Sequence, residues 1–470
     1  MMVRLLASPR LISLLLTTTF LLHLLVAVSV PLTVDEAHYA LYGIHLDWSY
    51  FDHPPLVGWL QALVLTLGEQ EWQLRLWALF SYALSLWLIY GYTRYLTQSL
   101  ASANLAALLF SCMPIVHVLG IGLVPDTLLL PLSIALIWQA QRTLAKTTWQ
   151  NWMLMGVLLG LSALSKYTAV LFVFGLLLLM LTHKDGWRHL ITFGFWLAVL
   201  VAAIMSLPIL TWNLEHDWIS INYQLNHGHP EAVFNWLNVG QSQLGQMLLY
   251  TPLIWFTAWL SLFMVGTAWK SPNYRQLLLF ILPAVLVFSL SSGKEPSLPH
   301  WLAFFYVLLL PLIAHQIMQG AHWMMPVTTA NLLYGFALTL LVVILSLFPK
   351  MTAHWSPNPT QDLIGWKQAA EIGQSLRQDN ESLIVIHWVD ASRIAWYARP
   401  TSVVVMDERY DQFDIWFGSP NRDTHGILVI PPDKRVDDWQ GYFAHCQALA
   451  QSGDGFHFLR CKDVKLNLLQ

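Results

Sequence analysis

The chain has 470 residues, of which 56% are hydrophobic and 11% are charged, and its mean hydropathy is +0.51. A soluble globular protein carries roughly a quarter charged residues, so this composition predicts a polytopic membrane protein. The formal net charge of −3 gives no indication of a nucleic-acid partner, and three cysteines are too few for a disulfide framework.

Apolar windows that are long enough to cross a bilayer recur along most of the chain. A helix needs about 20 residues to cross the hydrocarbon core, and this rule predicts about eleven spans. The first window follows Arg4 and Arg10, and its length favours a membrane span over a cleaved signal peptide. The windows lie near residues 11–31, 73–92, 101–119, 124–141, 151–165, 167–182, 190–212, 246–269, 276–291, 300–318 and 324–348.

The distribution of lysine and arginine predicts the orientation of these spans, because cytoplasmic loops carry an excess of both residues. With the N-terminus inside, the outer-face loops include 32–72 and 213–245, and the chain from Lys350 onward also lies outside. The cytoplasmic loops then hold Arg94, Arg142, Lys146, Lys184, Arg188, Lys270 and Arg275.

The C-terminal part of the chain differs in character from the rest. Short β-type runs at 383–386, 402–405 and 427–430, with a helical pattern over 362–377, predict a small α/β domain. We therefore expect a membrane domain over 1–349 and a soluble domain over 350–470. Cys446 and Cys461 lie in the soluble domain; they either pair in an oxidising compartment or stay as two buried thiols.

The first outer-face loop concentrates acidic and histidine side chains beside the membrane, where they are costly unless they have a function. Asp35 and Glu36 follow the first span; a carboxylate here serves as a general base or caps a helix over 36–45. Asp52 and His53 precede Pro54-Pro55. They are either ligands of a divalent cation or part of a turn before a helix.

Several charged residues further along the chain also fall on the outer face. Lys166 and Lys294 break the trend of cytoplasmic cations. An unpaired ammonium suits a phosphate ligand, and snorkelling to the membrane interface is the alternative. Arg75 begins the second span and either binds phosphate or pairs with Glu69 or Glu71. Asp126 follows Pro125 at a short turn, where it caps the next helix or faces a ligand.

The sequence contains no P-loop, HExxH, CxxC or GxSxG motif, so it does not support nucleotide hydrolysis as an energy source. A lipid or sugar transporter or flippase is the alternative from another class. Such a protein needs polar groups deep in several spans and an internal repeat, and the sequence lacks both. A transferase of the same fold with another donor lipid also remains open.

In their order along the chain, these motifs resemble the GT-C membrane glycosyltransferases, and within them the branch of the protein O-mannosyltransferases and lipid A aminoarabinose transferases. The resemblance covers roughly residues 10–350, a length in keeping with many membrane helices. Its motifs are Asp35-Glu36, Phe51-Asp52-His53-Pro54-Pro55-Leu56, Arg75, Pro125-Asp126, Leu164-Ser165-Lys166-Tyr167-Thr168, Trp212-Asn213, Gly293-Lys294-Glu295 and Pro299-His300-Trp301.

The resemblance implies a GT-C fold of about eleven transmembrane helices with a small C-terminal α/β periplasmic domain, in a bacterial inner membrane. The N-terminus would be cytoplasmic and the active site periplasmic. The implied activity is inverting transfer of a hexosyl or pentosyl group from a polyprenyl-phosphate donor. The acceptor would be a hydroxyl of lipid A, of another glycolipid or O-antigen, or of a protein.

The resemblance also implies roles for individual residues. Asp35 would be the general base, Glu36 would orient it or contact the sugar, and Asp126 would position the donor or acceptor. Arg75, Lys166 and Lys294 would stabilise the leaving phosphate. A divalent metal is the one candidate cofactor, with Asp52 and His216 as ligands or with His300 in place of His216. The aminoarabinose branch has Glu-Lys where this chain has Asp52-His53. The other substrate-binding residues would be Tyr39, His53, Tyr167, Asn213, Glu295 and His300.

Overall fold

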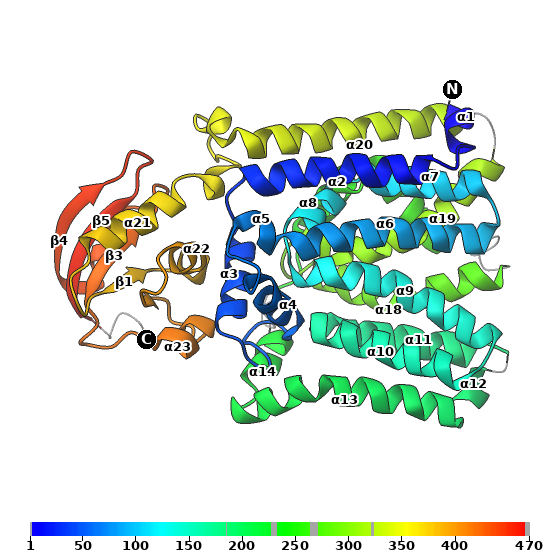
Figure 1. The fold of residues 1–470 in the computed structure, drawn as a ribbon, viewed down its shortest axis with the longest axis horizontal. Helices are drawn as coiled ribbons and strands as arrows, with labels where there is room; N and C mark the ends of the chain where they lie inside the picture. The colour runs from blue at the N-terminus through cyan, green and yellow to red at the C-terminus, as the bar shows by residue number, and fades with distance from the viewer. Residues whose placement is uncertain (1, 185, 227–232, 264–270, 321–323, 466–470) are drawn as a thin grey trace. The chain divides into compact units, whose positions relative to one another are not determined.

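The computed structural model describes residues 2–184, 186–226, 233–263, 271–320 and 324–465 (Figure 1). The chain divides into two compact units. We call residues 1–28, 53–57 and 75–344 the helical unit, and residues 29–52, 58–74 and 345–470 the sheet unit. Lys270, with parts of the predicted span 246–269 and of the loop 213–245, lies outside the described residues.

The helical unit consists of apolar helices joined by short connections (Figure 1). The hydrocarbon core of a bilayer offers no hydrogen-bond partners. A membrane-spanning segment therefore forms a helix, in which the backbone N–H and C=O groups bond to one another. The helices are α1 (Met2–Leu6), α2 (Leu11–Ser29), α6 (Leu76–Thr97), α7 (Leu100–Ser111), α8 (Pro114–Ile121), α9 (Pro125–Ala145), α10 (Trp149–Ser165), η1 (Tyr167–Ala169), α11 (Val170–Thr182), α12 (Gly186–His189), α13 (Phe193–Glu215), α14 (Ile219–Asn226), α15 (Trp236–Leu249), α16 (Pro252–Phe263), α18 (Pro272–Ser291), η2 (Pro299–Leu302), α19 (Ala303–Gln319) and α20 (Met324–Leu347).

Among the described residues, 7 helices are long and apolar enough to cross a membrane, or 8 if the pair α7 and α8, bent by 71°, forms one span. By length and composition, the described residues therefore contain fewer spans than the about eleven predicted. The windows at 151–165, 167–182 and 246–269 coincide with shorter helices: α10 has 17 residues, and the segments Tyr167–Thr182 and Pro252–Phe263 are shorter still. Apolar composition alone did not predict the lengths of these three helices. The predicted class, a multi-pass helical membrane protein with a small C-terminal α/β domain, is confirmed.

Helices α11 and α18 approach each other closely at a glycine. A Cβ atom on Gly175 would collide with the backbone oxygen of Phe280. The rings of Phe172 and Phe280 stack beside this point, with centroids 5.2 Å apart. Small residues allow membrane helices to approach each other closely. In a bilayer the hydrophobic effect does not drive helix association, so van der Waals contacts at such close approaches stabilise the helix pair. The hydrogen side chain of Gly175 therefore fixes the spacing of this helix pair.

We expect Gly175→Ala to destabilise the helical unit by about 1–3 kcal/mol, because the added methyl group forces α11 and α18 apart. Gly240→Ala is the matched control, since a Cβ there meets nothing within 4 Å. Thermal unfolding of the purified protein in detergent measures the effect. Equal midpoints for Gly175→Ala and Gly240→Ala would contradict the close packing described here.

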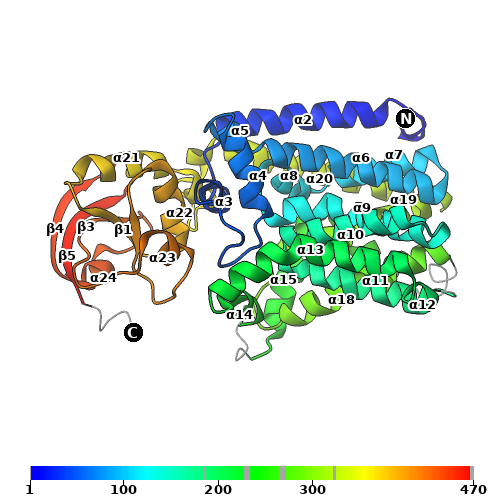
Figure 2. The same ribbon diagram turned by 60° about the horizontal axis from the view of Figure 1, so that its bottom comes forward.

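The sheet unit contains a five-stranded sheet of order β2-β1-β3-β5-β4 (Figure 2). Strands β1 (Ser382–Val385), β2 (Val403–Val405) and β3 (Gly426–Ile430) are parallel, and β5 (His457–Val464) pairs antiparallel with β3 and with β4 (Phe443–Gln451). The remaining elements are α3 (Val34–Ile44), α4 (Leu56–Leu65), α5 (Glu71–Leu74), η3 (Pro349–Thr352), η4 (Gln361–Leu363), α21 (Trp366–Leu376), α22 (Trp388–Tyr397), α23 (Gln412–Phe417) and α24 (Val436–Gln440).

Parallel strands buried on both faces are uniformly apolar, and β3 follows this rule with five buried residues. The three predicted strands are confirmed, and no strand end differs from its predicted position by more than one residue. Helix α21 buries Trp366, Ala369, Ala370 and Gly373, a spacing that places one apolar stripe toward the sheet.

The sheet unit also includes residues 29–52 and 58–74, which lie far from its strands in the sequence. The predicted division at 349/350 did not assign residues 29–52 and 58–74 to the C-terminal unit. The division itself stays a prediction.

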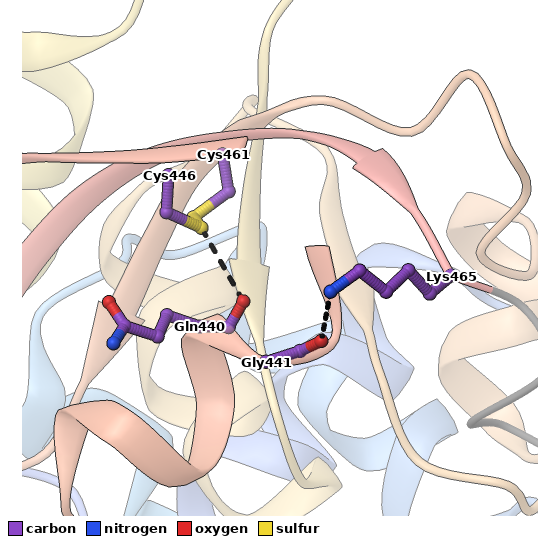
Figure 3. The surroundings of a disulfide bond; sticks show 5 residues. All are labelled: Gln440, Gly441, Cys446, Cys461 and Lys465. Atoms are coloured by element: carbon purple, nitrogen blue, oxygen red, sulfur yellow. Dashed lines mark hydrogen bonds between the residues drawn. A yellow bond between two sulfur atoms is a disulfide. The ribbon is translucent and has the colours of Figure 1, made fainter. Parts of the chain in front are cut away.

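Cys446 and Cys461 form a disulfide bond between the adjacent strands β4 and β5, where they are directly paired in the register (Figure 3). Of the two alternatives for these thiols, pairing is the one that the structure contains. The end of α24 lies beside the bond, and the Lys465 ammonium donates to the Gly441 carbonyl at 3.1 Å. Cys112 is a buried free thiol in the helical unit.

We expect the double variant Cys446→Ala/Cys461→Ala to lose about 3 kcal/mol of unfolding free energy in the sheet unit. The bond closes a loop with a sequence separation of 15 and so restricts the unfolded chain. Peptide mass spectrometry after alkylation under denaturing conditions checks the bond itself. Only Cys112 should be alkylated before reduction; modification of all three cysteines would contradict the disulfide.

Candidate functional site

The helical unit holds a cluster of three ionisable residues, Asp126, Lys166 and His300, which we call the Asp126 cluster. The Lys166 Nζ donates to both carboxylate oxygens of Asp126, at 2.8 and 2.7 Å. The His300 Nε2 lies 3.7 Å from Asp126 Oδ2. The side chains of Asp126 and Lys166 are only 8% and 11% exposed. Charged groups this deep in an apolar bundle are expensive, so they point to a function.

Local sequence explains how two helix ends bring Asp126 and Lys166 together. Pro125 occupies the first position of α9, where its fixed φ favours the helix, and the Asp126 carboxylate complements the positive helix end. Helix α10 ends at Ser165 because Lys166 is extended, with φ −154°. The Ser165 hydroxyl donates to the Pro125 carbonyl at 2.8 Å and ties the two ends together.

Aromatic side chains surround the Asp126 cluster on the η2 side. The Lys166 Nζ lies 5.7 Å from the centroid of the Trp301 ring, a distance suited to a cation–π interaction. Tyr250 donates its hydroxyl to the Pro299 carbonyl at 2.7 Å and so fixes the start of η2. His53 also interacts electrostatically with Asp126. Four predicted site residues, Asp126, Lys166, His300 and His53, thus belong to one environment.

The expectation that Lys166 is an unpaired cation is wrong, because Asp126 lies within hydrogen-bond distance. An ammonium carries three N–H donors, and the two carboxylate oxygens take two of them. The neighbouring Tyr167 is held through its hydroxyl, 2.6 Å from the Ser220 hydroxyl in α14. Each residue of the segment 165–167 therefore has a side-chain hydrogen bond that holds it in place.

Asn213 and His216 occupy the end of α13. The Asn213 amide donates to the Ile209 carbonyl at 2.9 Å, and its oxygen accepts from the Ile221 backbone N–H at 3.3 Å. The His216 ring stacks on Trp212 with centroids 4.0 Å apart, and its Nδ1 lies 2.9 Å from the Trp212 carbonyl. Asn213 thereby connects α13 to α14, while its predicted substrate contact stays a prediction.

Three predicted phosphate or substrate residues lie elsewhere in the helical unit. Arg75 is 1% exposed and donates to the Ala27 carbonyl at 2.8 Å, which ties the start of α6 to α2. Lys294 and Glu295 are exposed just beyond the end of α18. Asn238 donates to the Lys294 carbonyl at 2.9 Å, so α15 holds this segment.

In the sheet unit, two of the three predicted catalytic acids, Asp35 and Glu36, lie in the first turn of α3. The N-cap of α3 is Thr33, so Asp35 is not the helix cap; it occupies the second helical position and is half-buried. Glu36 is buried and accepts from the Thr33 backbone N–H and hydroxyl, both at 3.0 Å. Tyr39 is buried one turn later, with its ring 5.4 Å from that of Tyr42.

Asp52 is the centre of a polar group that the sequence did not reveal. The Tyr42 hydroxyl donates to Asp52, and the His38 Nε2 lies 3.7 Å from the same carboxylate oxygen. Burial and the nearby Asp52 raise the pKa of Tyr42 well above its ordinary value, so the phenol keeps its proton. The His38 Nδ1 lies 3.3 Å from the Ser392 hydroxyl of α22. His38 and Tyr42 are four positions apart on one helix, and this spacing is the one feature of the sequence that indicates the two side chains lie side by side.

The side chains present do not fit the predicted metal site. Within the part of the chain that the structure describes, no three His, Cys, Asp or Glu side chains are grouped so that they could hold a metal ion. Asp52 accepts a hydrogen bond from Tyr42, and the His216 Nδ1 faces a backbone carbonyl. We therefore assign no reaction step to a metal.

Comparisons with known proteins find similarity over parts of the chain. The family model of the dolichyl-phosphate-mannose-protein mannosyltransferases matches residues 52–212. A lipid A galacturonosyltransferase of Rhizobium johnstonii is 26% identical over 288 residues, which are 58% of this chain and 58% of that protein. The undecaprenyl phosphate-alpha-4-amino-4-deoxy-L-arabinose arabinosyl transferase 2 of Proteus mirabilis is 26% identical over 54% of this chain and 47% of its own length.

Solved structures give the same fold. ArnT from Cupriavidus metallidurans in the apo state has a TM-score of 0.69 and 14% identity, and the match covers 95% of this chain and 97% of ArnT. The structure of the same ArnT bound to undecaprenyl phosphate also has a TM-score of 0.69 at 14% identity, and that match covers 97% of this chain and 98% of ArnT. The resemblance expected from the motifs is thereby confirmed, and the GT-C fold with it.

Proposed function

We propose that the chain is an inverting glycosyltransferase that moves a sugar from a polyprenyl-phosphate donor to an acceptor hydroxyl. The Asp126 cluster carries this proposal, because it places a buried lysine among apolar helices of a membrane protein. The named activities of both relatives support it. So does the undecaprenyl phosphate bound to a structure of the same fold.

The reaction is a single displacement at the anomeric carbon. The acceptor hydroxyl gives its proton to a carboxylate, and its oxygen forms the new bond to the anomeric carbon. The bond from that carbon to the phosphate oxygen breaks, and its electron pair leaves with the lipid phosphate. Because the attack comes from the face opposite the leaving group, the configuration inverts. We assign the general base to Asp35, which follows the end of α2 and is half-buried.

The Asp126 cluster would act on the leaving phosphate. Asp126 fixes the ammonium of Lys166 through two N–H donors, which leaves the third for a phosphate oxygen. A cation that is already oriented stabilises the negative charge that develops as the bond breaks. Arg75 and Lys294 are proposed as further phosphate contacts, and Glu36, Tyr39, His53, Tyr167, Asn213, Glu295 and His300 as residues that orient the catalytic base or contact the substrates.

The acceptor and the side of the membrane are also part of the proposal. Lipid A is the acceptor class named for the relative from Rhizobium johnstonii, so it is the first acceptor to test. The disulfide in the sheet unit favours an oxidising compartment, which supports a periplasmic site in the inner membrane of a bacterium. The cytoplasmic loops with Arg94, Arg142 and Lys146 support a cytoplasmic N-terminus.

Release of undecaprenyl phosphate tests the proposed reaction. The purified protein is mixed with an undecaprenyl-phosphate-linked sugar and with lipid A, and the lipid products are measured by mass spectrometry. We expect undecaprenyl phosphate and glycosylated lipid A in equal amounts, with inverted configuration at the new linkage. A product with retained configuration would contradict single displacement, and transport of an intact donor without transfer would favour the transporter class.

A further inference from the structure

The sheet unit contains a cavity of about 1060 Å³ that none of the proposed catalytic residues line. Its walls include the segments that follow the three parallel strands: 386–390 after β1, 406–409 after β2 and 432–434 after β3. The strand order places β2 on one side of β1 and β3 on the other. In open sheets of this type, ligands bind at the carboxyl ends of the strands where the order reverses. The cavity lies at that place.

Aromatic rings form a large part of the cavity wall. Trp439 and Tyr442 are half-buried and nearly parallel, with an interplanar angle of 17°. The Trp366 ring is covered by the Arg393 guanidinium at 3.4 Å, whereas the Trp355 side chain is 51% exposed. Trp388 completes the set of aromatic residues that line the cavity. Flat apolar surfaces of this kind pack against the C–H faces of a sugar ring, while the edges of the ring keep polar partners.

The polar lining is rich in carboxylates. The five acids Asp362, Asp390, Asp407, Glu408 and Asp433 outnumber the cations Arg393, Arg409 and Lys434. Arg393 lies 3.0 Å from Asp362 and 3.8 Å from Asp390, Lys434 lies 3.4 Å from Asp433, and Arg409 lies 3.3 Å from Asp411. The cations are thus already engaged, and Asp407 and Glu408 supply the excess of negative charge.

Two of these acids also carry a proton more readily than an ordinary aspartate. Burial raises the pKa of Asp390 to about 6, although the nearby Arg393 opposes the shift. Burial, with the carboxylate of Asp411, raises the pKa of Asp407 to about 6. At neutral pH such a carboxyl group is mostly ionised and accepts hydrogen bonds from hydroxyls, and below its pKa it also donates one.

Two buried N–H donors in the wall of the cavity have no hydrogen-bond acceptor among the described residues. They are Nε1 of Trp366 and Nε of Arg393, and the Arg393 side chain is 1% exposed. Buried donors are nearly always paired in folded proteins, so an orphaned donor calls for an oxygen that the chain itself does not supply. Because both atoms are buried, a ligand or water oxygen reaches them only if the side chains of the cavity wall shift.

We propose that this cavity is a carbohydrate-binding site for a saccharide that carries no negative charge. The aromatic walls bind the apolar faces of the sugar, and the carboxyl groups bind its hydroxyls. The excess of carboxylates repels acidic sugars and admits neutral or amino sugars. The site is distinct from the proposed catalytic residues, so it does not rest on the proposed transferase activity.

Saturation-transfer NMR on the full-length protein tests the site, in a detergent without a sugar headgroup and in the absence of donor lipid. The probes are N,N′-diacetylchitobiose, which is neutral, the glucosamine dimer, which is cationic, and digalacturonic acid, which is anionic. We expect saturable binding of the first two and at least tenfold weaker binding of the third. Binding of digalacturonic acid as tight as that of N,N′-diacetylchitobiose would overturn the charge selectivity.

Two variants with different chemistry locate the binding. Trp439→Ala removes an aromatic wall, and Asp407→Asn keeps the shape but removes a charge; each should weaken binding of N,N′-diacetylchitobiose at least fivefold. Asp423→Asn is the matched control, because Asp423 is an exposed acid that does not line the cavity. Thermal unfolding confirms that each variant is folded. Unchanged affinity in both folded variants, or no saturable binding to the wild type, would overturn the proposal.

Discussion

Replacing Asp35 by asparagine is expected to lower glycosyl transfer by roughly two to four orders of magnitude, the usual contribution of a general base. Asparagine has nearly the same size, but its amide cannot accept the proton of the acceptor hydroxyl. The contacts between Thr33 and Glu36 that begin α3 do not involve the Asp35 side chain, so the helix should persist. The measurement is the turnover of purified protein at saturating donor, together with its affinity for undecaprenyl phosphate.

Asp47→Asn is the control for this experiment. Asp47 lies in the same loop, and its Oδ1 accepts from the Trp48 backbone N–H at 2.7 Å, which the amide oxygen of asparagine can also do. We expect near-normal turnover in this variant. Undecaprenyl phosphate should bind to Asp35→Asn as it does to the wild type. Normal turnover in Asp35→Asn would remove Asp35 as the base, and lost lipid binding would reassign it to the donor site.

The second large effect is expected from the pair Asp126 and Lys166. Lys166→Met removes the ammonium and leaves the Asp126 carboxylate buried, which typically costs about 3–5 kcal/mol of stability. Turnover should fall by roughly 10²–10³, as it does when one preorganised group that stabilises developing charge is lost. Asp126→Asn should also lower both quantities, because the Lys166 ammonium loses the partner that orients it.

The double variant Asp126→Asn/Lys166→Met separates structure from catalysis. It no longer buries an unpaired charge, so we expect it to regain part of the stability lost in each single variant. Its turnover should stay as low as that of Lys166→Met, because the phosphate still lacks its cation. Recovery of turnover along with stability would show that the pair serves only the fold.

Local features of the chain were predictable from the sequence, since they depend on composition and periodicity. The parallel strands are continuous apolar runs, and α21 repeats its apolar residues at helical spacing. The number of spans was harder to predict. The segment 151–165 lies in α10, whose 17 residues are at the short end of the range for a membrane span, so apolar composition does not decide how many spans the chain has.

Contacts between distant segments were beyond sequence reasoning. Asp126 and Lys166 are separated by 40 positions, and only the meeting of two helix ends makes them partners. The polar group of Asp52, Tyr42 and His38 depends on a loop that folds back on α3 and on Ser392 far along the chain. Nor does composition predict that residues 29–52 and 58–74 join the C-terminal sheet in one compact unit.

The most direct test of the proposed transferase activity is mass spectrometry of the lipid and glycan fractions from cells that produce the wild type, Asp35→Asn or no protein. We predict that one envelope lipid or glycan gains the mass of a single sugar with the wild type only. That product should be absent from both other strains, while the undecaprenyl-phosphate-linked donor accumulates in them. Identical spectra from all three strains, or the same product with Asp35→Asn, would contradict base-catalysed glycosyl transfer by this protein.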